Sequence, residues 1–69
     1  MNINLAVDKA FETKTLKEIA ASPTHALQGL TPVHAEHLAA LGIKTIGDMG
    51  TNKFFLWAQA IAALAAREQ

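Results

Sequence analysis

Residues Leu41–Met49 read LGIKTIGDM, in which two glycines and a threonine interrupt two apolar runs. Gly42 is placed to end a helix, because glycine readily adopts the left-handed backbone conformation found at helix C-termini. Thr45 and Asp48 form a capping box in which aspartate replaces the usual glutamate. The stretch therefore predicts a tight turn that joins two helices.

Helix-capping signals recur along the chain, and no window alternates apolar and polar residues as a strand does. The candidate helix starts are Thr15 with Glu18, Ser22 before Pro23, Thr31 before Pro32, and Thr51 or Asn52. Near the N-terminus, Ile3, Val7 and Phe11 recur at helical spacing. We predict an all-α fold: a compact bundle of four to five short helices, with a longer C-terminal helix from Lys53 to about Arg67.

From about residue 27 to 64 the pattern resembles helix-hairpin-helix domains, and most closely the degenerate type found in SAM-like helical folds. That type reads L-x-x-L-G-I-x-T-I-x-D-L. It is carried here by Leu38, Leu41, Gly42, Ile43, Thr45, Ile46 and Asp48, with Met49 in place of the last leucine. The resemblance implies a helix-hairpin-helix-like core, but no single function, because such folds serve both nucleic-acid binding and pure protein contacts.

In DNA-binding members of that superfamily the hairpin reads G-x-G, and its backbone amides hold a phosphate. This chain keeps Gly42 but has Lys44 at the position of the second glycine, and Asp48 would repel a phosphate. We therefore expect a structural bend. The alternative is weak, sequence-nonspecific nucleic-acid binding by Gly42, Ile43, Lys44, Thr45 and Lys53.

Length and composition narrow the classes of function. The 69 residues predict one domain, 1–69, in which an N-terminal helical segment, 1–21, packs on the core, 22–69. Six basic and six acidic side chains give zero net charge, which weighs against nucleic acid as a partner. Without cysteine there are no disulfides, so a cytoplasmic location is the default expectation. We expect neither a secretory signal nor a membrane span.

No side chains are arranged as nucleophile, base and acid, and a thin alanine-rich core can hardly enclose a pocket. We therefore expect a non-catalytic protein without a cofactor. Turning the helix after Thr31 at about 100° per residue places His34 and His37 on its apolar side, so we expect both to be semi-buried. The alternative is a metal or pH-sensing site that adds His25, although no cysteine or carboxylate is placed to complete a tetrahedron.

The stretch KFFLWAQAIAALAARE, residues 53–68, is apolar on nearly every side. The main stripe of its helix is predicted to face the core and consists of Phe54, Trp57, Ile61 and Leu64. Phe55 and Leu56 fall outside that stripe. Either the N-terminal helix covers them or they form a partner-binding surface.

The sequence thus predicts a small protein–protein interaction or oligomerisation module. It would bind a partner chain or a second copy of itself as a homo-oligomer. The predicted contact residues are Phe55, Leu56 and Gln59, with Leu5 as a secondary candidate.

Overall fold

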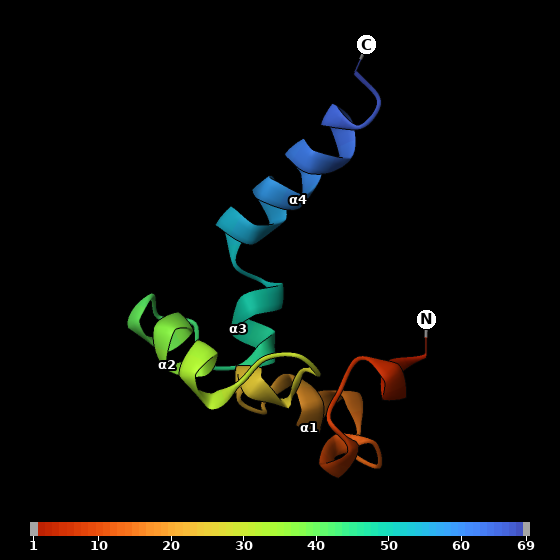
Figure 1. The fold of residues 1–69 in the computed structure, drawn as a ribbon, viewed down its shortest axis with the longest axis vertical. Helices are drawn as coiled ribbons and strands as arrows, with labels where there is room; N and C mark the ends of the chain where they lie inside the picture. The colour runs from red at the N-terminus through yellow and green to blue at the C-terminus, as the bar shows by residue number, and fades with distance from the viewer. Residues whose placement is uncertain (1, 69) are drawn as a thin grey trace.

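The computed structural model describes residues 2–68, which form short helices joined by tight turns (Figure 1). Within these residues no strand occurs, and the extended pairings are two isolated antiparallel bridges, Val7 with Leu27 and Pro23 with Thr45. The all-α prediction is confirmed. In chain order, the elements are the 3-10 turns and α-helices η1 (Ile3–Leu5), η2 (Lys9–Phe11), α1 (Leu16–Ala20), η3 (Thr24–Ala26), α2 (Pro32–Ala40), α3 (Ile46–Gly50) and α4 (Lys53–Ala65).

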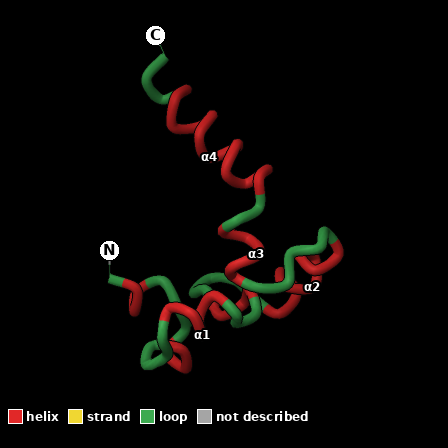
Figure 2. Tube along the Cα trace, turned by 180° about the vertical axis from the view of Figure 1, so that it is seen from behind, coloured by secondary structure: helices red, strands yellow, loops and turns green. Residues whose placement is uncertain are grey.

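Residues 2–50 form a lobe, and α4 extends away from it (Figures 1 and 2). The radius of gyration is 13.5 Å. A compact chain of this length would have a radius of gyration of about 11 Å. Helix α4 contacts α3 and is joined to it through Thr51 and Asn52. The predicted bundle is therefore not closed around the last helix.

The N-terminal segment does not form the α-helix that its apolar spacing predicts. It folds as η1 and η2, and the amide of Asp8 donates to the carbonyl of Ala26 at 2.8 Å. The amide of Gln28 returns a hydrogen bond to the carbonyl of Ala6 at 2.9 Å. Because these backbone groups pair with the η3 region, they are not free for a continuous helix, and the segment lies away from α4 (Figure 2).

Helix α3 is held against the end of α1 by the backbone. The amide of Ile46 donates to the carbonyl of Ser22 at 3.0 Å. One residue further, Gly47 faces α1 so closely that a Cβ there would lie 3.1 Å from the carbonyl oxygen of Ala20. A side chain at position 47 would therefore fit only if α1 and α3 moved apart by a few tenths of an ångström.

Most of the predicted helix caps are confirmed. Capping boxes are present at Thr15, Thr31 and Thr45, and Asn52 caps α4. The prediction for Ser22 is wrong: its hydroxyl donates to the carbonyl of Glu18 at 2.7 Å and so satisfies the end of α1.

The core is thin. Among residues 2–68, four apolar side chains are buried, Val7, Ile19, Ala26 and Ile43, together with the polar Ser22 and Thr24. Thr24 is fully buried, and among the described residues its hydroxyl oxygen has no hydrogen-bond partner. An unpaired hydroxyl in such a core costs about 1–3 kcal/mol.

We predict that Thr24→Val raises the free energy of unfolding by up to about 1 kcal/mol, because it replaces the unpaired hydroxyl with a methyl group of similar size. Thr24→Ser is the matched control, since it keeps the hydroxyl but deletes a buried methyl group, and it should lower stability by about 1 kcal/mol. Urea unfolding followed by circular dichroism measures both. A clear loss of stability in Thr24→Val would contradict the prediction.

Candidate interaction surface

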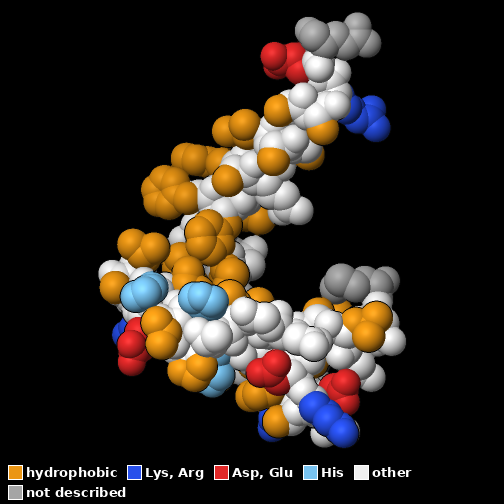
Figure 3. Space-filling view, viewed as in Figure 1, with side chains coloured by type: hydrophobic (Ala, Val, Ile, Leu, Met, Phe, Trp, Pro, Cys, Tyr) orange, Lys and Arg blue, Asp and Glu red, His pale blue; other side chains and the backbone are white. Residues whose placement is uncertain are grey.

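Helix α4 carries six of the ten large apolar side chains that are exposed among residues 2–68. Every residue from Lys53 to Ala65 is exposed, and apolar side chains follow the helix along its length (Figure 3). The prediction that its main stripe is core is wrong: Phe54, Trp57, Ile61 and Leu64 are 60%, 57%, 67% and 70% exposed. The stripe is uncovered because α4 leaves the lobe and the N-terminal segment is fastened elsewhere.

These four residues, which we call the seam, follow one another at intervals of three, four and three residues. At about 100° per residue they occupy an arc of roughly 80° on one side of α4. This spacing is that of the a and d positions of a heptad. This spacing is visible in the sequence, but it is equally typical of a helix side that packs in the core. The sequence alone therefore does not show that the seam is exposed.

The aromatic end of the seam is held together by specific contacts. The rings of Phe54 and Trp57 meet edge to face, with centroids 5.7 Å apart and planes at 88°. The ammonium of Lys53 lies 5.2 Å from the centroid of Phe54 and 5.6 Å from that of Trp57. Cation–π attraction therefore steadies both rings. Such a pair is suited to anchor a contact with another chain.

The residues predicted to bind a partner do not form one surface. Phe55, Leu56 and Gln59 share α4 and lie on the side away from the seam. Phe55 is the least exposed of the large apolar side chains of α4. Leu5 is 76% exposed but belongs to η1, which lies away from α4 (Figure 1). The structure therefore groups three of the four and separates Leu5 from them.

The hairpin is a helix C-cap followed directly by a helix N-cap. Gly42 has a φ of 83°, and its amide donates to the carbonyl of Ala39 at 2.9 Å. The amide of Ile43 donates to the carbonyl of Leu38 at 3.0 Å, and the Ile43 side chain is buried. This pair of bonds is the Schellman motif. Gly42 thus ends α2, as predicted, and Ile43 anchors the turn in the core.

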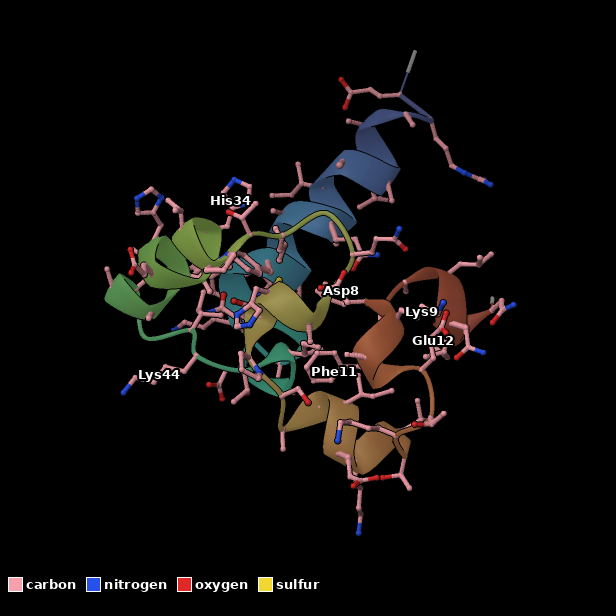
Figure 4. All side chains as sticks on the ribbon, turned by 60° about the horizontal axis from the view of Figure 1, so that its bottom comes forward. Asp8, Lys9, Phe11, Glu12, His34 and Lys44 are labelled. Atoms are coloured by element: carbon pink, nitrogen blue, oxygen red, sulfur yellow. The ribbon has the colours of Figure 1, made fainter. Side chains whose placement is uncertain are left out.

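The backbone amides of the hairpin already donate hydrogen bonds to a carboxylate of the same chain. Oδ2 of Asp48 accepts hydrogen bonds from the amides of Lys44 and Thr45, both at 3.1 Å. Both bonds lower the pKa of Asp48, and the bond from Lys44 has the larger effect. Asp48 therefore stays ionised where a phosphate would have to bind, while the Lys44 side chain extends away from the turn (Figure 4).

The predicted burial of His34 and His37 is wrong, since both are exposed. Nδ1 of His34 accepts from the amide of Thr31 at 3.2 Å, so the imidazole caps α2 instead of packing in the core (Figure 4). The side of α2 that faces the lobe carries Ala35 and Leu38. It is rotated by about a quarter-turn about the helix axis from the side that the sequence predicted to be buried.

The third histidine, His25, is half-buried in η3, and its Nδ1 has no partner among residues 2–68. In the same part of the chain, no three histidine, cysteine or acidic side chains lie close enough together to share a metal ion.

No pocket is found in the described part of the chain, and none of its helices is long and apolar enough to cross a membrane. No protein-family model matches the chain, and searches of curated proteins and of solved structures also found no match.

We predict that acid opens the hairpin through Asp48. Because its folded-state pKa lies below the ordinary value of 3.8, the contribution of the carboxylate is complete above that pH and is lost as pH falls through the lowered pKa. The amide NMR signals of Lys44 and Thr45 should therefore shift only below about pH 4.

Asp48→Asn should remove this transition and leave the equivalent acid response of Glu18 at the start of α1 unchanged, because the pKa of Glu18 is lowered separately by its bonds with Thr15. Amide shifts at Lys44 and Thr45 that titrate near pH 6 would contradict the assignment to Asp48.

Proposed function

We propose that this protein is a non-catalytic protein–protein interaction domain that docks on another chain through α4. The observation that carries the proposal is the exposure of the seam along a whole face of the helix. The lobe serves as the base from which the helix projects.

The size of the exposed surface supports an interaction role. More than half of each seam side chain is exposed. Since a large side chain presents about 150–250 Å², the seam alone offers roughly 500 Å² of apolar surface. The flanking Ala58, Ala60 and Ala65, which are also exposed, add to it. A contiguous apolar patch larger than a few hundred Å² is rare on a monomeric soluble protein and often marks an interaction site.

The stability of the helix supports the same role. A helix shorter than about 12–15 residues is marginal in water, and most helices in proteins owe their stability to a packed apolar face. Helix α4 spans Lys53–Ala65, and its N-terminus is capped by Asn52, which accepts from the amides of Phe54 and Phe55 at 2.9 and 3.1 Å. A partner laid along the seam would supply the packing that the lobe does not.

The hairpin gives less support to nucleic-acid binding, although its two helices and tight turn are consistent with the helix-hairpin-helix resemblance. Asp48 accepts from the amides that a phosphate would need, and the net charge of the chain is zero. We therefore place binding on α4 and not on the hairpin.

Ile61→Asp tests the proposal, with Ala63→Asp as the matched control on the other side of the same helix. Both positions are exposed, so both variants should keep the melting curve of the lobe within a few degrees of wild type. A carboxylate at position 61 would enter a dry contact, and association should weaken at least 100-fold. A carboxylate at position 63 should weaken it less than threefold.

The measurement is cross-linking in cells, followed by affinity purification of the tagged full chain and quantification of its complexes. Complexes that are lost with Ile61→Asp and kept with Ala63→Asp are the expected result. Equal complex formation by wild type and Ile61→Asp would overturn the proposal. Unfolding of Ile61→Asp alone would also overturn it, because it would show that position 61 belongs to the core.

A further inference from the structure

We infer that the chain that covers the seam is a second copy of this protein, paired through an antiparallel contact between the two α4 helices. The inference rests on the proposed function and names its partner.

The first argument is the pattern of the seam. Large apolar residues at a and d positions let two helices interlock knobs into holes, and two identical seams complement each other by symmetry. The positions beside the seam carry small side chains, Ala58 and Ala65 on one flank and Ala60 on the other. Small flanking residues allow the two backbones to approach closely.

The second argument is charge. Between Lys53 and Arg67 the helix carries no ionisable side chain. Pairing two such helices therefore requires no charged group to be stripped of water in the middle of the contact. The charged residues lie at the ends of the helix, where they stay at the rim.

The third argument fixes the orientation. In an antiparallel pair centred at Gln59, Phe54 lies opposite the partner's Leu64, and Trp57 lies opposite the partner's Ile61. Each bulky aromatic thus meets a smaller aliphatic side chain, which suits close packing. A parallel pair would instead set Trp57 against the partner's Trp57 and leave the smaller residues facing one another.

The shape of the molecule also favours the antiparallel pair. Because α4 projects from one side of the lobe, an antiparallel arrangement places the two lobes at opposite ends of the helix pair (Figure 1). A parallel arrangement would bring both lobes to the same end, where they would compete for space. The helix dipoles are also opposed in the antiparallel pair, which is the favourable orientation.

The area is sufficient for a reversible dimer. Two seams together bury about 1,000 Å², and the flanking alanines bring the contact to roughly the 1,200 Å² of a small stable interface. Interfaces at this lower end of the size range belong mostly to weak, transient complexes. Because area alone does not set affinity, we test the pairing over a wide range around a dissociation constant on the order of micromolar.

Sedimentation equilibrium of the purified full chain tests the pairing over about 1–500 µM, a range chosen around that constant. We expect the mass to rise from 7.4 kDa to twice that value. The emission of Trp57, the single tryptophan, should shift to the blue as the dimer forms. Ile61→Asp should remain monomeric, and Ala63→Asp should dimerise like the wild type.

A chain that stays monomeric throughout this range would overturn the inference. If complexes in cells still depend on Ile61 in that case, the proposed function stands with a different protein as partner. A monomer whose Trp57 emission shifts only when phosphatidylcholine vesicles are added would overturn the inference in favour of a lipid surface.

Cysteine cross-linking tests the orientation, since the natural sequence contains no cysteine. In the antiparallel pair, Ala60 and the partner's Ala60 lie beside the centre on the same flank, about 3 Å apart along the axis. Ala65 and the partner's Ala65 lie roughly 18 Å apart along the axis. Ala60→Cys should therefore form covalent dimers with a short thiol cross-linker, and Ala65→Cys should not. Equal cross-linking of the two variants would overturn the antiparallel pair.

Discussion

The hydrogen bond from the amide of Ile46 to the carbonyl of Ser22 fixes how the helices of this protein are arranged. It sets α3 against the end of α1, where Gly47 permits the close approach. It also holds the hairpin so that Ile43 is buried. Because α4 follows α3 after only two residues, the orientation of α3 directs α4 away from the lobe. A backbone contact thus determines which apolar surface stays exposed.

The parts of the fold that the sequence predicts correctly are those that depend on neighbours within five residues. The exchange between Thr45 and Asp48 is one example, since the side chain of each bonds to the backbone of the other. The C-cap at Gly42 is another. Such exchanges have the same geometry wherever they occur, so a short stretch of sequence specifies them without knowledge of the rest of the fold.

Two of the wrong predictions, the core side of α4 and the N-terminal helix, share a different cause. The spacing of Phe54, Trp57, Ile61 and Leu64 shows that one side of a helix is apolar but not what covers that side. The spacing of Ile3, Val7 and Phe11 likewise shows only that the N-terminal segment has an apolar side. It does not show that the amide of Asp8 donates to the carbonyl of Ala26 instead of taking part in a continuous helix. Both outcomes depend on pairings between residues distant in sequence. For the candidate site, the sequence identified the helix and its excess of apolar residues, but it predicted as core a side that the structure leaves exposed.

The division of the chain into a lobe and a projecting helix keeps the large side chains of α4 out of the buried core. The lobe combines few buried apolar side chains with capping boxes and bridge hydrogen bonds, so its stability does not require the large side chains of α4. Those side chains are free to contact a partner. A ligand that binds the folded form raises its apparent stability with concentration, and a partner along the seam would do so chiefly by stabilising α4. Changes at Ile43 should therefore weaken the lobe at every concentration, whereas changes at Ile61 should matter only where the partner is present.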